Sequence, residues 1–223
     1  MEFVLIPKGS FVMGFPDSDA EAFPDEKPAH RVTITQPFYL GKYPVTQAQW
    51  EAVMGNNPSR FKGNPSHPVV NVSWDDVQAF LHKLNEREGE GHYCLPTEAQ
   101  WEYACRAGTE TPRYHPDINA IAWYSSNSIG KPQPVGQKLP NAWGLYDMLG
   151  NVLEWCHDGE RKYTAEAAID PMGLTSAGAH RVVRGGSWFV PARHVQAALR
   201  YSFGPDVRND NLGFRCASLV RQR

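Results

Sequence analysis

The sequence GLYDMLGNVLEW occupies residues 144–155, and it is followed by RGGSW at residues 184–188 and by LGFR at residues 212–215. All three segments combine glycine with large apolar or aromatic side chains. Glycine permits turns that other residues resist, and tryptophan buries a large area, so we expect tight turns held against an aromatic core. These segments therefore indicate a fold, and most of their residues are interpreted as core and turn residues.

Three helices are predicted upstream of these segments by their N-terminal caps. Thr46 precedes a helix over residues 47–54 with Gly55 as its stop. Ser and Thr accept hydrogen bonds from the free N–H groups of a helix start, and a Gln, Asp or Glu three residues later returns the bond. Two further helices carry this pattern, one with Ser73 and Asp76 and one with Thr97 and Gln100. The apolar stripe of the second comprises Val77, Phe80, Leu81 and Leu84, and the third turns Trp101, Ala104 and Cys105 inward and ends at Gly108.

The remaining chain predicts short strands and many loops. Residues 3–14 predict two strands around a Lys-Gly turn, and residues 30–35 alternate as a half-buried strand after a charged loop over residues 17–28. After Gly108 the periodicity is lost. With 19 Gly, 18 Pro and 7 Trp, an α+β, irregular and loop-rich fold in a single domain over residues 1–223 is expected.

Composition excludes several classes of protein. The net charge of −2 provides no basic field for nucleic acid. No apolar run approaches the length of a membrane span, and residues 1–7 lack the features of a signal peptide, so we expect a cytoplasmic protein unless a targeting segment has been removed. Four dispersed cysteines are interpreted mostly as buried thiols.

Taken in order, the motifs resemble the formylglycine-generating-enzyme-like (sulfatase-modifying-factor) family from end to end. Besides the three segments above they include VTQAQW at 45–50, PVVNVSW at 68–74 and LPTEAQWEYA at 95–104. The resemblance implies that family's irregular α+β variant of the C-type lectin-like fold.

The resemblance also implies a cofactor that this sequence does not support. Oxidases of the family hold copper with two cysteines after the Gly-Gly-Ser-Trp segment, and by spacing these positions fall near Val190 and Val195. Valine has no atom that binds Cu(I), for which thiolates are the suitable ligands. We therefore expect no copper and no formylglycine-generating oxidase activity, and no catalytic residue is assigned.

One metal site is expected from the family. Its Gly-Asn-x-x-Glu-Trp loop binds Ca²⁺, and oxygen donors suit that ion. The corresponding donors here are the carboxylates of Asp147 and Glu154 and the main-chain carbonyls of Gly150 and Val152. The other reading of the two carboxylates is that they cap turns or pair with an arginine. A second calcium loop is not expected, because residues 123–135 replace it with a shorter stretch.

Residues 188–215 also resemble the variable region of proteins that diversity-generating retroelements target. Framework residues such as Arg193, Arg200 and Arg208 alternate with clusters of unrelated character. In the resembled proteins, adenine-directed mutagenesis of Asn codons cannot yield Trp, Met, Lys, Glu or Gln, and these types are absent from the clusters. The clustered residues are Phe189, Val190, Pro191, His194, Leu199, Tyr201, Ser202, Phe203, Gly204, Val207, Asn209, Asp210 and Asn211.

These observations leave three functional hypotheses. The first is a non-catalytic binding protein that displays a diversified surface to an unknown protein or other macromolecule, since Tyr, Phe, Ser, Gly and Asn suit adaptable contacts. For this reading we expect Phe189, His194, Leu199, Tyr201, Phe203, Val207 and Asp210 to share one exposed face. The second is a cysteine-free enzyme of the same family with different chemistry, and the third is a regulatory domain of a larger protein.

Overall fold

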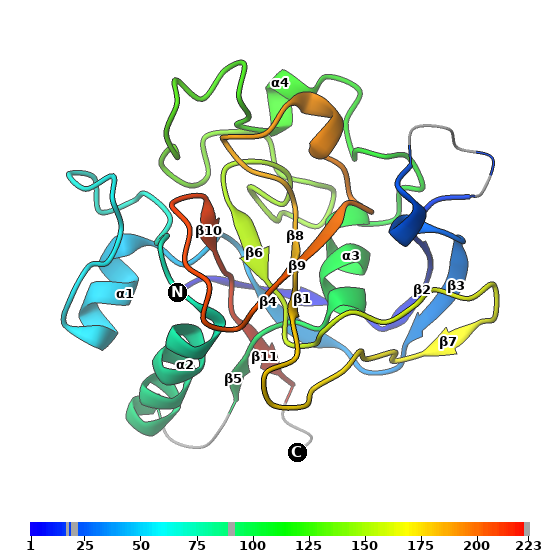
Figure 1. The fold of residues 1–223 in the computed structure, drawn as a ribbon, viewed down its shortest axis with the longest axis horizontal. Helices are drawn as coiled ribbons and strands as arrows, with labels where there is room; N and C mark the ends of the chain where they lie inside the picture. Colours follow the sequence, from blue (N-terminus) through cyan, green and yellow to red (C-terminus); the bar gives the residue numbers. More distant parts are fainter. Residues whose placement is uncertain (17, 19–21, 89–91, 221–223) are drawn as a thin grey trace.

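The structure is a computed structural model, and it describes residues 1–16, 18, 22–88 and 92–220. Part of the expected charged loop, residues 17 and 19–21, lies outside the described residues. The described chain contains short helices around three small sheets (Figure 1). The helices are α1 (Gln47–Met54), α2 (Trp74–Glu88), α3 (Glu98–Arg106) and α4 (Ile118–Ile121), with 3-10 turns η1 (Pro24–Glu26) and η2 (Ala192–His194).

The predicted helix caps are confirmed. The Thr46 side chain accepts from Gln49 N, and Thr97 accepts from Gln100 N, with the reciprocal bonds present in both helices. Ser73 N donates to Asp76 Oδ2 at 2.9 Å, so α2 begins with the same exchange. The predicted end of α3 is one residue late, because Ala107 already adopts the left-handed conformation at φ 44°. None of the helices in the described part of the chain is long and apolar enough to span a membrane.

The strands form a four-stranded sheet β1-β4-β11-β5, a four-stranded sheet β10-β6-β8-β9 and a three-stranded sheet β2-β3-β7. The two N-terminal strands exist as predicted, but they join different sheets, since β1 pairs with β4 and β2 with β3. The strands are β1 (Phe3–Ile6), β2 (Gly9–Met13), β3 (His30–Ile34), β4 (Phe38–Gly41), β5 (Tyr93–Cys94), β6 (Leu153–Trp155), β7 (Ala168–Ile169), β8 (Arg181–Arg184), β9 (Arg200–Phe203), β10 (Leu212–Gly213) and β11 (Ala217–Leu219).

Aromatic side chains fill the interior, as the sequence indicates. Trp101 and Trp155 are fully buried, and the ring of Trp50 stacks on Phe80 with centroids 5.2 Å apart. The four cysteines are free thiols, and burial raises the pKa of Cys94 to about 11. This core surrounds β8, which lies between β6 and β9 and brings the C-terminal segment against α3 (Figure 1).

Candidate functional site

The expected variable segment forms η2, β9 and the loops around them. Twelve of the thirteen clustered residues are at least partly accessible to solvent, and Phe189 is 67% exposed. Leu199 is the exception. Its side chain is 2% exposed, so the expected exposure of Leu199 is wrong.

The segment also contains a strand that no periodicity in its sequence indicates. Residues 200–203 form β9, which pairs with β8 from Arg181↔Phe203 to Arg184↔Arg200. Four residues are too few to show a clear alternation of polar and apolar side chains in the sequence. Whether they form a strand depends on the partner strand. Because successive side chains point to opposite faces, the clustered residues of β9 cannot all share one face.

The rings of Tyr201 and Phe203 are half-buried rather than freely exposed. Both rings pack against the buried hydrophobic cluster that includes Trp50, Phe80 and Trp155. The centroid of the Phe203 ring lies 6.3 Å from that of Trp155. Tyr201 also stacks on His194, and the Tyr201 hydroxyl and His194 Nδ1 form a hydrogen bond. Phe23 extends this aromatic group, with its centroid 5.4 Å from the His194 ring.

The imidazole of His194 is held in its neutral form. Arg193 Nε donates to His194 Nε2 at 3.0 Å, so Nε2 is an acceptor. Burial, and then the charge of Arg193, lower the pKa of His194. Protonation would break this contact, and His194 therefore acts here as a packing and hydrogen-bonding residue.

Phe189 lies at the other end of the segment, beside a fixed tryptophan. The buried Trp188 ring contacts Phe189 at 5.5 Å, and Trp188 Nε1 donates to the main-chain oxygen of Asp210 at 3.1 Å. The Asp210 carboxylate forms an ion pair with the exposed Arg60 at 2.9 Å. Residues 188–189 and 210 are thereby brought together although they are distant in sequence.

Two framework arginines, one exposed and one buried, anchor the segment through carboxylates. Arg208 makes a two-pronged contact with Asp76, with nitrogen–oxygen distances of 2.7 and 2.8 Å. Arg200 makes a similar contact with Glu98, at 2.7 and 2.8 Å. These two arginines therefore brace the segment through carboxylates, whereas Arg193 contacts His194.

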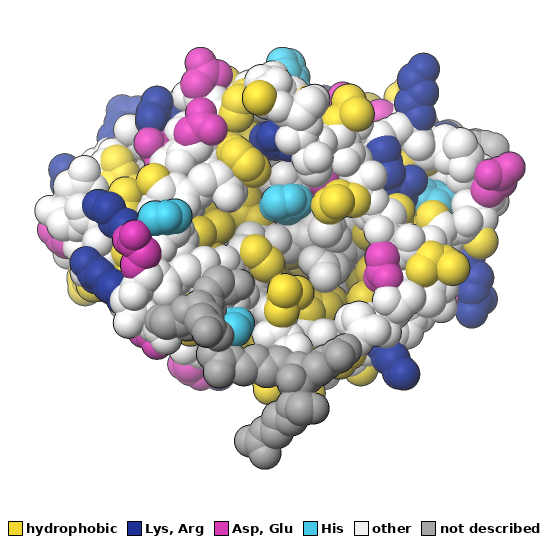
Figure 2. Space-filling view, turned by 90° about the horizontal axis from the view of Figure 1, so that it is seen from below, with side chains coloured by type: hydrophobic (Ala, Val, Ile, Leu, Met, Phe, Trp, Pro, Cys, Tyr) yellow, Lys and Arg dark blue, Asp and Glu magenta, His cyan; other side chains and the backbone are white. Residues whose placement is uncertain are grey.

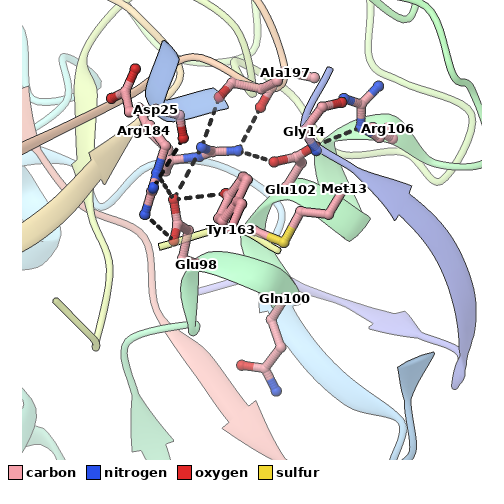
Figure 3. Close-up of polar contacts among 12 residues, drawn as sticks. Met13, Gly14, Asp25, Glu98, Gln100, Glu102, Arg106, Tyr163, Arg184 and Ala197 are labelled. Carbon is pink, nitrogen blue, oxygen red and sulfur yellow. Dashed lines mark hydrogen bonds and ion pairs between the residues drawn. The ribbon is translucent and has the colours of Figure 1, made fainter. Parts of the chain in front are cut away.

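Behind β9 lies a buried charge network that sequence reasoning missed (Figure 3). Glu98 and Glu102 project from one face of α3, and Arg184 of β8 pairs with both. Arg106 adds a bond to Glu102 at 2.8 Å. Burial tends to raise the pKa of Glu102, but Arg106 and Arg184 outweigh it and hold that pKa below its usual range. The only signal in the sequence was a pair of glutamates four residues apart on the inward face of a predicted helix.

The two carboxylates expected to bind calcium have other partners in this arrangement. Both oxygens of Glu154 accept from Arg215 at 2.7 Å, and Trp101 Nε1 donates to Oε2 at 2.7 Å. Asp147 accepts from the main chain of Gly136 at 2.7 Å, and burial raises its pKa to about 6. The positive charge of a guanidinium neutralises the carboxylate beside it and repels a metal cation.

The carboxylates of Asp147 and Glu154 therefore do not fit Ca²⁺ as arranged here. Gly150 lies in a left-handed turn, and Val152 is buried. Calcium binding itself is not tested by these contacts, which favour the ion-pair reading of Glu154. Within the described residues, no group of three or more His, Cys, Asp or Glu side chains could hold a metal.

The positions that correspond to copper ligands lie in the same segment. Val195 is fully buried, and Val190 packs at the margin of the core. Cys216 is buried in the segment between β10 and β11, and burial raises the pKa of its thiol well above its usual range. These side chains contribute packing and supply no thiolate at this site.

Comparison with known proteins identifies the class. Residues 1–220 match the sulfatase-modifying factor enzyme 1-like domain, and the chain belongs to this formylglycine-generating-enzyme-like family. A formylglycine-generating enzyme of Streptomyces coelicolor is 30% identical and aligns with 96% of this chain and 88% of that protein. A serine/threonine-protein kinase pkn1 of Chlamydia pneumoniae is 32% identical over 98% of this chain, which spans only 38% of the kinase.

A solved structure gives the more particular likeness. Variable protein 1 of Treponema denticola superposes with a TM-score of 0.88 at 31% identity, covering 98% of this chain and 95% of that chain. The expected C-type lectin-like fold of the formylglycine-generating-enzyme type is thereby confirmed, and the chain resembles a retroelement variable protein.

Proposed function

We propose that this chain is a non-catalytic binding protein whose ligand surface is formed by the accessible clustered residues between 189 and 211. The partner would be a protein or another macromolecule. The likeness to variable protein 1 supports this proposal, and so does the division of the segment into buried and accessible positions. Trp188 is 8% exposed and its neighbour Phe189 67%, so framework and contact residues alternate along one chain.

One observation carries the proposal: the framework holds this segment by its main-chain oxygens. Ser125 N donates to Val190 O at 3.0 Å, Asn71 N to Asn209 O at 2.9 Å, and Leu153 N to Asn211 O at 2.8 Å. These oxygens are present whichever side chain the residue carries. Exchange of the side chain therefore leaves the anchoring bonds in place, as a diversified surface requires.

Framework arginines act in the same way between the clusters. Arg184 donates to the main-chain oxygens of Ala197 and Ala198 at 2.8 and 3.0 Å. Arg113 donates to those of Ala192 and Val195 at 2.7 and 2.9 Å. Hydrogen bonds from charged donors are stronger than neutral ones, so they fix the path of the chain beneath the accessible side chains.

The genomic neighbourhood tests diversification. We expect a near-copy of the coding segment for residues 188–215, with adenines at the codons of the accessible clustered positions, and a reverse transcriptase gene beside it. Adenines confined to these codons would support the proposal. A neighbourhood with neither the copy nor the reverse transcriptase would contradict it.

The second candidate is an enzyme of the same family, favoured by the identity to a named formylglycine-generating enzyme. Incubation with a cysteine-containing sulfatase-type peptide and copper, followed by mass spectrometry, tests whether that chemistry is formylglycine generation. With valine at 190 and 195, we expect intact peptide thiol and no stoichiometric copper. Conversion of the cysteine to an aldehyde would establish the enzyme reading.

A further inference from the structure

The turn over residues 128–131 presents an isoleucine in a conformation that isoleucine resists. Ile129 has φ 58°, in the left-handed region, where its branched β-carbon crowds the main chain. The side chain is 85% exposed, so burial within the protein does not compensate for this strain. Glycine or asparagine would suit the position better. A strained and exposed apolar residue therefore indicates a contact made outside the fold.

This turn is attached to the proposed ligand surface by hydrogen bonds on both sides of Phe189. Ser125 N donates to the main-chain oxygen of Val190 at 3.0 Å. Ser128 Oγ donates to that of Trp188 at 2.9 Å. Phe189 lies between the two acceptors in the chain, and the strained isoleucine directly follows the second donor. The turn thus brings a second exposed apolar side chain close to Phe189, which is itself 67% exposed.

A third segment, residues 56–70, reaches the same place through an aromatic contact. The Phe61 ring meets the Trp188 ring edge-on with centroids 5.6 Å apart, and the Trp188 ring lies 5.5 Å from that of Phe189. Phe61 is half-buried. Three segments that are distant in sequence therefore meet around Trp188. Their accessible apolar side chains, Phe61, Ile129 and Phe189, are called the apolar patch.

The segments that form the apolar patch contain no acidic residue. Residues 56–70, 123–135 and 186–198 have neither Asp nor Glu. In the described part of the chain, one ion pair joins these segments to a carboxylate, that of Arg60 with Asp210 at 2.9 Å. The charges of that pair offset each other, so the remaining cations of these segments determine the sign of the charge around the patch.

Two of these cations are lysines that flank the patch. Lys62 follows Phe61 in the chain, and Lys131 lies two residues after Ile129. Burial lowers the pKa of His67, and the nearby charge of Lys131 adds to this effect, so Lys131 lies close to the segment of Phe61. Both lysines are exposed, and within the described residues neither forms an ion pair. Their positive charge is therefore open to an outside partner.

Another face of the molecule also gathers apolar side chains but does not share this bias of charge. Figure 2 shows apolar side chains over the middle of the lower face, with basic and acidic side chains interspersed around them. A surface of mixed charge does not select the charge of a partner. At the apolar patch the unpaired charge has one sign, and it therefore favours a partner that carries carboxylates.

We propose that the apolar patch binds a segment of a partner protein in which apolar side chains are flanked by Asp or Glu. The apolar side chains cover Ile129 and Phe61, and the carboxylates meet Lys62 and Lys131. This inference rests on the proposed function, because Phe189 belongs to the proposed ligand surface, and it adds fixed residues from two other segments to that surface. A lipid surface would give a diversified Phe189 nothing to select, so a protein is the favoured partner.

The test begins with a library of random peptides displayed on phage and selected on the intact protein. Enriched peptides are synthesised with a fluorescent label, and their affinity is measured by fluorescence anisotropy at two salt concentrations. We expect peptides that contain aromatic or aliphatic residues and more Asp and Glu than Lys and Arg. Their affinity should fall as the salt concentration rises, since salt screens exposed charges.

Variants outside residues 189–211 then separate the patch from the rest of the ligand surface. Ile129→Asn should weaken binding by about tenfold, as expected for a central apolar contact. The same variant should melt at an unchanged or higher temperature, because asparagine tolerates the left-handed conformation. Lys131→Gln should weaken binding by about threefold. The matched controls, Ile169→Asn on β7 and Lys83→Gln on α2, replace equally accessible side chains and should leave the affinity unchanged.

Each other outcome would overturn a stated part of the inference. Enriched peptides without an excess of acidic residues would overturn the charge assignment. Peptides whose affinity depends on Tyr201 but not on Ile129 would overturn the patch and leave the proposed function standing. A lower melting temperature of Ile129→Asn would show that the isoleucine supports the fold. Sedimentation with vesicles of phosphatidylcholine and phosphatidylserine, abolished by Ile129→Asn, would overturn the assignment to a protein partner.

Discussion

Replacement of Glu154 with glutamine tests the assignment of this residue to an ion pair rather than to calcium. Glu154 is 1% exposed and Arg215 is fully buried, and the two make bonds at 2.7 Å through both carboxylate oxygens. The variant keeps one side-chain oxygen but removes the negative charge, so the arginine charge is left buried beside neutral acceptors, the main-chain oxygens of Gly41 and Tyr146 among them. Removal of one partner of a buried pair costs about 3–5 kcal/mol, a large share of the stability of a domain.

Urea unfolding followed by tryptophan fluorescence measures this loss. The wild-type protein and the variant are each unfolded in calcium chloride and in EDTA. We expect the same loss in both solutions and a wild-type stability that is indifferent to the chelator. The double variant Glu154→Leu/Arg215→Met should recover at least about 2 kcal/mol, because it removes both charges. A wild-type protein stabilised by Ca²⁺, with a variant that has lost this response, would refute the reasoning and establish Glu154 as a calcium ligand.

Three further predictions concern the surface and its support. Phe189→Ala should change the free energy of unfolding by less than about 0.5 kcal/mol, because the ring is mostly exposed, and a larger loss by urea titration would mean that the ring is core. Tyr201→Ala/Phe203→Ala should cost about 2–3 kcal/mol, since both rings pack against the core, and this exceeds the loss of about 1 kcal/mol expected for exposed rings. Burial raises the pKa of Glu26 from 4.5 to about 7, so its contribution is present below pH 4.5 and is lost as pH rises through 7. Glu26→Gln should therefore gain up to about 3 kcal/mol over the wild type between pH 5 and pH 8, and an equal difference at both values would contradict this.

The sequence predicted those parts of the fold that local chemistry determines. Thr46 and Thr97 specify helix starts because their hydroxyl groups are chemically suited to free N–H groups, whatever packs on the helix later. The sheet order could not be predicted in this way. The Lys-Gly turn between β1 and β2 suggests a hairpin, yet each strand pairs with a later segment, β1 with β4 and β2 with β3.

The accessibility of the clustered residues was largely predicted, but their packing was not. The clustered residues are accessible apart from Leu199, whose side chain is only 2% exposed. The half-burial of Tyr201 and Phe203 follows from β9, a strand too short to be evident without its partner. The pairing of Glu154 with Arg215 joins residues 61 positions apart, and no spacing rule connects them.

Diversification of the accessible clustered residues on a fixed framework is tested most directly by sequencing the coding segment for residues 180–220 in many isolates of the source population. We predict that amino-acid differences concentrate at the accessible clustered positions, such as Phe189, Tyr201 and Asn209. Trp188, Arg200 and Arg215 should remain unchanged, and Trp, Met, Lys, Glu and Gln should be absent from the differing positions. Differences spread evenly along the segment, or present equally at the buried framework residues, would contradict the account.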